Sequence, residues 1–547
     1  MARFSAWVFV ACAIVPHLPD LGAVEYFIDC HAAGRPIQDG SVDHPWSELA
    51  PAVAKLVAHD VLSIRPGIYR QSQLIIAVDE VRVRKDPAVP GVVVIDGEVP
   101  FHVLMNQDEQ GLQKKRDNGP FFDPVIVVTG AGVVLEGLEV RHGFVGISVR
   151  GERGQVLACH VHHTGQHGIE ITNHHGLVED CVVHDANLYN VKGQCLVDGI
   201  DKATGWPNQN SRKKITSTDP ARNGKNMDWG QGITFHGSYL QAWAPRGCVM
   251  RGNLLWNIWG EGLASYNAAE VRMERNVAFN IWRMAYYVQN VDSVTLDSNI
   301  AFYDRDFRRY LGAQAMAVCY SFANEYPADH LRIAMGADQA LVPDCSELTL
   351  INNLSYGGDY ALHSGDRHPL ATRGRIRVGN NLLMAPVSAA CINLNAVAAG
   401  PVEIRNNLLI RSGHHAAEQA GFLRLSEAFQ AVCTDNAFQQ RDATVKSWTD
   451  SLDRDLALVV DCANQVSAGF SWDANQAGLH AHLRSAIQSF RGLSLASVAS
   501  ASTAVAAVIN PWAGPDFFGF PASDRARVGP FAQPFSALQS PQTTPLP

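Results

Sequence analysis

The sequence predicts an all-β chain wound as a parallel β-helix, in which short strands stack coil upon coil. One short sequence motif, or phrase, recurs and ends at Asn253, Asn276 and Asn299, which are 23 residues apart (276−253 and 299−276). Apolar residues stand five and three positions before each asparagine, the alternation typical of a strand with one buried face. The phrase returns with longer gaps before Asn353, Asn381 and Asn407. We therefore expect these asparagines to form an internal ladder.

A second phrase, centred on a small residue, marks another strand of each coil. Its small residues step by 22, 64, 30 and 23 positions (168−146, 232−168, 262−232 and 285−262). The long step holds about 40 residues more than one coil, which predicts a loop insertion over residues 187–229. A repeat of roughly 23 residues is too short for a propeller blade and lacks the leucine-rich signature, so stacked coils are favoured.

Both ends of the chain differ from the repeats. Residues 4–15 form an apolar stretch too short to span a bilayer, and a potential cleavage site follows at Ala23. We predict a signal peptide over residues 1–23 and a secreted or periplasmic protein with no membrane association after cleavage. A non-cleaved N-terminal anchor is the alternative. The β-helix is expected over 24–440, and residues 441–547 are expected to pack irregularly on the last coils and end in a tail.

Composition narrows the partners. The chain has 547 residues, 47% of them apolar and 18% charged, which suits one extended solenoid core. We expect a monomer. A net charge of −9 argues against nucleic acid, which requires a basic face. The insertion is locally basic, and its Lys213 and Arg222 are candidates for binding a carboxylated sugar.

The second phrase also predicts an exposed polar face. Ile169 and Ile171 should point inward and Glu170 outward, so outward residues of successive coils should stack in columns. The expected columns are Ser148, Glu170, Thr234, Ala264 and Tyr287, then Arg150, Thr172, His236, Tyr266 and Gln289, with a turn row of His167, Gln231, Glu261 and Met284. Such a mixture of polar and aromatic groups is typical of a sugar-binding surface.

Two chemistries fit this face. His236 and Tyr266 on neighbouring coils could remove the proton alpha to a uronate carboxylate while an arginine or another cation neutralises that carboxylate. Glu170 and Glu261, on the order of 10 Å apart along the axis, could act as the acid and base of an inverting hydrolase. The residue pattern does not choose between them.

Four further residues of the face are expected to bind substrate in either case. They are His167, Gln231, Tyr287 and Gln289.

Histidine and cysteine are also patterned. His162 and His184 lie 22 positions apart and should stack, and Trp256, Phe279 and Phe302 continue their column. No carboxylate or cysteine completes a set with them at ligand spacing, so we predict an aromatic ladder and no metal site. Cys159 and Cys181 share another column and should form a disulfide or, as we favour, a buried thiol stack.

The repeats and both termini resemble the secreted right-handed parallel β-helix proteins of the pectate-lyase-like fold, a group of polysaccharide lyase and glycoside hydrolase type. The resemblance rests on the opening Tyr26 to Asp29, a short helix from Glu48 to Ala58, the strand region Val61 to Arg70, and the ending Asp516 to Pro521. It covers about residues 25–440 by repeat spacing. It implies a right-handed solenoid with a short N-terminal capping helix, and it says little about activity.

The chain departs from the catalytic motifs of these families. It lacks the calcium-binding aspartate set of pectate lyases, the Asp-Pro-His-Asp motif of mannuronan epimerases, and the Asn-Thr-Asp and Gly-His-Gly motifs of polygalacturonases. No catalytic residue therefore carries over from them, and a calcium requirement is left open.

Three functional hypotheses follow. The first is a secreted carbohydrate-active enzyme that cleaves a polysaccharide by β-elimination next to a uronate. The second is a glycoside hydrolase with paired carboxylates. The third is a non-catalytic surface protein that binds glycans along the same face.

Overall fold

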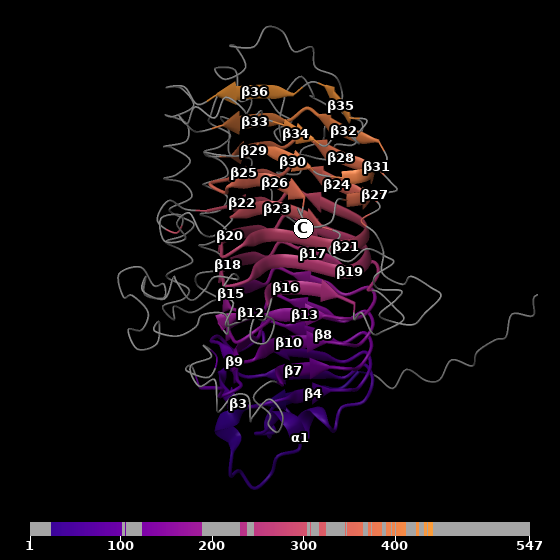
Figure 1. Cartoon of the computed structure of the whole chain (residues 1–547). Helices are drawn as coiled ribbons and strands as arrows, with labels where there is room; N and C mark the ends of the chain where they lie inside the picture. Colours follow the sequence, from indigo (N-terminus) through magenta and orange to yellow (C-terminus); the bar gives the residue numbers. More distant parts are fainter. Residues whose placement is uncertain are drawn as a thin grey trace, which may run out of the picture.

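A computed structural model shows the parallel β-helix that the repeats predict (Figure 1). It describes residues 23–100, 104, 123–188, 230–237, 245–303, 307, 317–323, 345, 347–364, 370–372, 375–385, 390–394, 396–399, 401–411, 423–425, 431–434 and 436–440. The signal peptide expected over residues 1–23, except Ala23 itself, nearly all of the insertion, and residues 441–547 lie outside this part. No helix among the described residues is long and apolar enough to cross a membrane.

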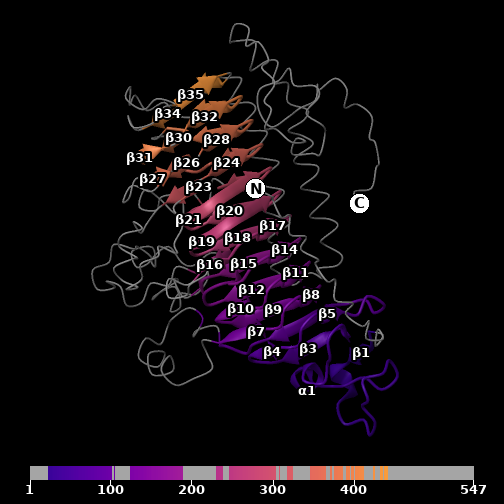
Figure 2. The same ribbon diagram turned by 90° about the vertical axis from the view of Figure 1, so that its right-hand side faces the viewer.

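The coils build three ladders of parallel strands. In Figure 1 the coils rise in sequence order from α1 at the bottom to β35 and β36 at the top. The first ladder contains β1 (Glu25–Ile28), β2 (Val61–Ile64), β5 (Arg82–Lys85), β8 (Val134–Glu136), β11 (Gln155–Leu157), β14 (Leu177–Glu179), β17 (Val249–Arg251), the end of β19 (Glu261–Glu274), the end of β21 (Met284–Asp297), β24 (Leu348–Ile351), β28 (Ile376–Gly379), β32 (Val402–Arg405) and β35 (Ala431–Thr434). In Figure 2 its strands β5, β8, β11, β14 and β17 follow one another along the solenoid.

The second ladder carries the predicted polar face. It contains β4 (Leu74–Ile76), β7 (Pro124–Val128), β10 (Val145–Val149), β13 (Ile169–Ile171), β16 (Gln231–His236), the starts of β19 and β21, β23 (Val318–Ala323), β26 (Tyr360–Ser364), β30 (Ile392–Leu394) and β34 (Leu423–Leu425). Because β19 and β21 run unbroken for 14 residues from the second ladder into the first, the two ladders form one 22-stranded sheet.

The third ladder is a separate 12-stranded sheet within the described residues. It contains β3 (Gly67–Arg70), β6 (Val93–Asp96), β9 (Glu139–Gly143), β12 (His160–Thr164), β15 (Val182–Ala186), β18 (Leu254–Ile258), β20 (Val277–Ile281), β22 (Ile300–Phe302), β25 (Leu354–Tyr356), β29 (Leu382–Ala385), β33 (Leu408–Arg411) and β36 (Ala437–Gln440). A small pair, β27 (Leu370–Thr372) and β31 (Ala396–Ala399), stands apart.

The first coil is closed by short helices. A 3-10 helix, η1 (Cys30–Ala32), precedes α1 (Leu49–Val53), which buries Leu49, Ala52 and Val53 against the solenoid end. This is the predicted capping helix, but it is shorter than the expected span from Glu48 to Ala58. The chain leaves the helix after Val53 through tighter turns and reverses at His59, whose φ of 73° no helix accommodates.

The asparagine ladder is confirmed. The backbone N–H and side-chain amide of Asn253 both donate to Asn276 Oδ1, at 3.0 and 2.9 Å, and Asn276 donates in the same way to Asn299, at 3.0 and 3.0 Å. Each amide also donates to a carbonyl of the preceding coil, as Asn276 does to Met250 at 3.0 Å. The pattern continues through Asn353, Asn381, Asn407 and Asn436. These amides satisfy buried backbone groups at a turn where no strand can.

Cysteines extend the ladder towards the N-terminus. The Cys181 N–H donates to Asn253 Oδ1 at 3.0 Å, and the Cys159 N–H lies 3.4 Å from Cys181 Sγ. Both thiols are buried and free, so the structure contains the thiol stack and not the disulfide. A sulfur accepts hydrogen bonds weakly, which makes this end of the ladder less polar than the end built from asparagine.

Asn276→Ala should lower the free energy of unfolding by about 1–3 kcal/mol, because it leaves the buried Asn253 N–H and Met250 carbonyl without partners. The half-buried Asn436, where water can replace the lost bonds, supplies the control: Asn436→Ala should cost clearly less. Denaturant unfolding of both variants measures the difference. Equal stability of Asn276→Ala and the unmodified protein would contradict an energetic role for the ladder.

Candidate functional site

The second ladder places the predicted columns in register. Glu170 on β13 pairs with Thr234 on β16, which pairs with Ala264 on β19. His236 pairs with Tyr266 on the neighbouring strand. Because β13 and β16 are direct neighbours, the insertion between them adds no coil to the solenoid. The sequence therefore predicted correctly that Glu170, His236 and Tyr266 share one side of the molecule.

Glu170 is the centre of a polar cluster. Ser148 donates its hydroxyl to Glu170 Oε1 at 2.5 Å, and the Arg150 guanidinium donates to Ser148 Oγ at 3.2 Å. On the other side, Nε2 of His236 lies 3.4 Å and Nε2 of His167 lies 3.9 Å from Glu170 Oε2. The carboxylate thus faces hydrogen-bond donors on three coils.

These contacts keep Glu170 ionised. Burial by itself raises the pKa of this carboxyl group, but the hydrogen bond from His236, the nearby His167 and the Ser148 hydroxyl outweigh burial and lower the pKa to about 2. A group with this pKa carries no proton near neutrality. Glu170 therefore cannot supply the protonated carboxylic acid that an inverting hydrolase needs.

The proton positions around His167 are set by its neighbours. The backbone N–H of Gln231 donates to His167 Nδ1 at 3.2 Å. A backbone N–H can only donate, so Nδ1 is unprotonated and Nε2 presents its proton towards Glu170. His167 also stacks beside His236, with 6.0 Å between ring centroids. His167 thus positions the Glu170 carboxylate and the His236 ring together.

Tyr266 belongs to a second polar group one coil further on. The side-chain amide of Gln231 donates to the Tyr266 hydroxyl at 2.7 Å and to Glu261 Oε2 at 3.1 Å. The hydroxyl oxygen of Tyr266 accepts this bond, which leaves its own O–H proton to be donated elsewhere. Glu261 is only 3% exposed, so its carboxylate is held beneath the surface beside Gln231.

The remaining substrate-binding candidates are either buried or outside the described residues. Tyr287 and Gln289 are each 3% exposed, and Tyr287 belongs to an apolar cluster against which Tyr266 packs. They occupy outward positions of the sheet, paired with Ala264 and Tyr266, but they are buried there and do not line an exposed surface. Gln231 is equally buried and acts through Tyr266. Lys213 and Arg222 lie outside the described residues.

Sequence reasoning placed Ser148 and Arg150 in the columns but gave them no role. The signal was present, because Ser148 stands directly below Glu170 and pairs with it in register. Arg150 is exposed and holds the Ser148 hydroxyl, so it adds a cation to the same face. The described face therefore carries both positive and hydrogen-bonding groups around Glu170.

The third ladder carries the predicted aromatic stack. His162 and His184 lie parallel with 4.9 Å between ring centroids, and His184 lies 4.4 Å from Trp256. Phe279 and Phe302 continue the column at 6.0 and 4.7 Å. The packing prediction for these residues is confirmed.

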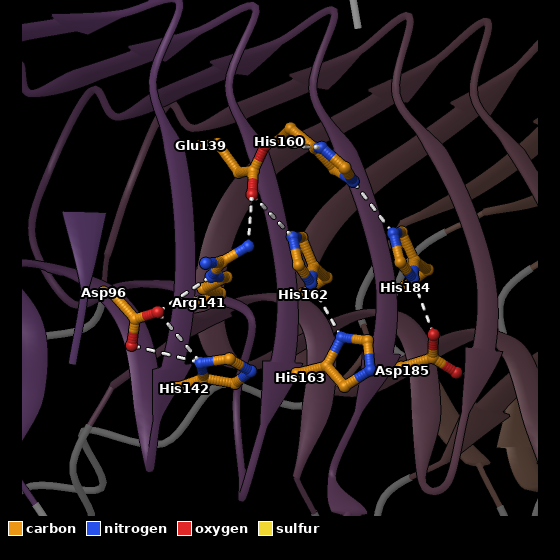
Figure 3. A network of polar contacts seen from close by, with 9 residues as sticks. All are labelled: Asp96, Glu139, Arg141, His142, His160, His162, His163, His184 and Asp185. Atoms are coloured by element: carbon orange, nitrogen blue, oxygen red, sulfur yellow. Dashed lines mark hydrogen bonds and ion pairs between the residues drawn. The ribbon is translucent and has the colours of Figure 1, made fainter. Parts of the chain in front are cut away.

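The expectation that no carboxylate completes a ligand set with these histidines is wrong. Figure 3 shows Glu139 beside His160 and His162, and Asp185 beside His184 and His163. His184 Nδ1 lies 2.7 Å from Asp185 Oδ2. Glu139 comes from the coil below, and Asp185 follows His184 directly in the chain, so neither has the sequence spacing of a familiar metal motif.

Burial keeps three imidazoles of this cluster neutral. It lowers the pKa of His160 and of His162 well below 6.5, with the neighbouring histidines adding to the effect, and it lowers the pKa of His163 to about 4. Each of these three rings therefore has one unprotonated nitrogen at neutral pH.

Comparison with known proteins bears on the fold. No family model and no curated protein sequence matches the chain. Among solved structures it is similar to a pectate lyase (14% identity, 77% of this chain and 82% of that chain, TM-score 0.42) and to the alginate lyase from Paenibacillus sp. str. FPU-7 (10%, 71% and 96%, TM-score 0.39). It is also similar to the GH87 α-1,3-glucanase of Streptomyces thermodiastaticus strain HF3-3 (12%, 76% and 70%, TM-score 0.35).

With TM-scores below 0.5 and identities of 10–14%, these similarities add nothing to the parallel β-helix that the strand ladders of this chain define. The particular reaction must be argued from the residues of the second ladder.

Glu170→Gln should destabilise the protein by on the order of 3 kcal/mol at neutral pH, because the pKa of Glu170 falls from its ordinary 4.5 to about 2 on folding. A lowered pKa stabilises the fold above the ordinary value, and this contribution is lost as the pH falls through the folded value. The difference between Glu170→Gln and the unmodified protein should hold above pH 4.5 and shrink towards pH 2. Denaturant unfolding across this range measures it, and a difference that does not vary with pH would contradict the assignment.

Proposed function

We propose that this protein is a polysaccharide lyase that cleaves a uronate-containing glycan by β-elimination. The observation that carries the proposal is the pairing of His236 with Tyr266 on adjacent strands, with the Glu170 carboxylate behind the histidine. β-Elimination needs a base for the proton alpha to the carboxylate and an acid for the departing oxygen. These two residues offer both.

His236 is assigned the role of base. Its Nε2 faces Glu170, and an Nε2–H donated to that carboxylate leaves the lone pair on Nδ1. The imidazolium formed by proton uptake is then stabilised by the ionised Glu170, as a carboxylate stabilises the histidine of a catalytic triad. The side chain of His236 is 33% exposed, so substrate can reach it.

Tyr266 is assigned the role of acid. As the proton leaves C5 of the uronate, the C4–O4 bond breaks, a C4–C5 double bond forms, and the Tyr266 hydroxyl protonates O4. The Gln231 amide, 2.7 Å away, stabilises the resulting phenolate by hydrogen bonding. Arg150, on the same face, is suited to neutralise the substrate carboxylate, which makes the C5 proton more acidic.

A hydrolase built on Glu170 and Glu261 is the competing assignment. It is weakened because the pKa of Glu170, about 2, leaves only Glu261 as a possible acid, and that residue is buried. The proposal includes a secreted or periplasmic location and a monomer as the active form.

His236→Ala and Tyr266→Phe should each lower kcat by at least about 100-fold, the loss typical of a missing acid or base. Tyr287→Phe, which removes a buried phenolic hydroxyl from the neighbouring strand, is the matched control and should keep activity. A panel of acidic and neutral polysaccharides is followed by ultraviolet absorbance of the unsaturated product and by reducing-end release. Reducing ends without new absorbance would replace the lyase by a hydrolase, and neither signal would leave a glycan-binding protein.

The mature protein should begin at Val24. Expression of the full chain in a Gram-negative host, followed by N-terminal sequencing of the periplasmic and culture fractions, tests this expectation. A chain that stays in the membrane fraction with Met1 retained would support the uncleaved anchor instead.

A further inference from the structure

The histidine cluster on the third ladder is separate from the groups that the proposed reaction uses. It occupies the outer side of β12 and β15, together with Glu139 and Arg141 of β9 (Figure 3). His160 and His184 are 5% and 1% exposed. Water does not solvate these buried rings, so another interaction must account for so many imidazoles packed together.

The backbone explains how the cluster arises. His142, His163, Asp185, Asn257 and Asn280 all have φ between 48 and 54° and occupy the same place in successive coils. A left-handed residue interrupts the alternation of a strand, so two consecutive side chains can point to the same side. The inward residues of β15 are accordingly Val183 and Ala186, three positions apart, with His184 and Asp185 between them.

From this placement we propose that His163, His184 and Asp185 form a binding site for a divalent transition-metal ion, represented by Zn²⁺. One ligand atom from each lies within 4.8 Å of the other two. Donors around a tetrahedral Zn²⁺ lie about 3.3 Å apart for bonds near 2.0 Å, so small side-chain rotations close the site. Two imidazoles and a carboxylate are ligands that suit Zn²⁺, and they leave a fourth position for water.

The second ring nitrogens of both ligand histidines are already engaged. His163 Nδ1 lies 2.7 Å from His162 Nδ1, and His184 Nε2 lies 2.8 Å from His160 Nε2. Metal-ligating histidines characteristically donate their other N–H to an acceptor, which fixes the ring and the tautomer. The ion would replace the hydrogen bond between His184 Nδ1 and Asp185 Oδ2. With His163 and His184 donating in this way, Nε2 of His163 and Nδ1 of His184 then present their lone pairs to the ion.

The series of hydrogen bonds between the rings ends at the Glu139 carboxylate, which can accept them. His162 and His160, having accepted, turn their remaining N–H groups towards Glu139, with His162 Nε2 3.3 Å from Oε1 and His160 Nδ1 3.9 Å from Oε2. With the ion at Asp185, each of the four imidazoles then carries one proton, and the His162–His163 and His160–His184 contacts each pair a donor with an acceptor.

A second set, Glu139, His160 and His162, has a similar spacing. It is less suited to a cation, because Arg141 Nη1 lies 3.3 Å from Glu139 Oε1 and already neutralises that carboxylate. Asp185 contacts His184 and Asn257, and no arginine or lysine in the described part of the chain forms an ion pair with it. Charge therefore favours the site at Asp185 over the one at Glu139.

The test uses the full-length protein stripped of metal with a chelator and titrated with Zn²⁺ by calorimetry. One ion per chain should bind with micromolar or tighter affinity and raise the melting temperature. Asp185→Asn and His163→Asn should weaken binding by at least about 100-fold, and asparagine suits both positions because it tolerates the left-handed backbone. Cobalt(II) in place of Zn²⁺ should give visible absorption bands that both variants lose.

Two variants separate the alternatives. Asn280→Asp, in the same backbone column but beyond Asn257, should leave Zn²⁺ affinity unchanged. Glu139→Gln, which acts on the ion only through His160 and His162, should weaken it by about 10-fold, the lower end of the range for an outer partner. The proposal is overturned if Zn²⁺ does not bind, if Asp185→Asn and His163→Asn bind as tightly as the unmodified protein, or if Glu139→Gln is the variant that loses the ion.

Discussion

Vertical register between coils is the constraint on which the whole structure depends. Parallel strand pairing fixes it along the three ladders, and the asparagine ladder fixes it at a turn, where backbone groups would otherwise be buried without partners. A shift of one residue would reverse the facing of every side chain in a strand. The register therefore converts positions such as 170, 234 and 264 into neighbours.

The same regularity allows a polar site to form without disturbing the core. Inward positions such as Ile169 and Ile171 supply the core, so the outward positions between them can carry polar side chains. Ser148, Glu170 and His236 come from three coils and still meet within hydrogen-bonding range. Glu170 is the residue they share, and its low pKa follows from having donors on both sides. In the proposed reaction, its ionised carboxylate stabilises the imidazolium of His236.

The third ladder shows what a local break in regularity can do. The column of left-handed residues places His163 and Asp185 on the same side as His162 and His184, so polar ligands gather beside an aromatic stack. On later coils the same column carries Asn257 and Asn280, while Trp256 and Phe279 replace the histidines. One backbone device thus supports a polar cluster on some coils and apolar packing on others.

The sequence by itself determined the coil, the asparagine ladder, the aromatic stack and the columns of the second ladder, because each depends on a repeated spacing that can be counted. Tertiary structure alone decided the rest. The burial of Tyr287 and Gln289 depends on neighbours that periodicity does not reveal. The carboxylates beside the histidines depend on backbone dihedral angles: the left-handed conformation of Asp185 and the rung position of Glu139 bring together groups that a strict two-residue alternation would separate.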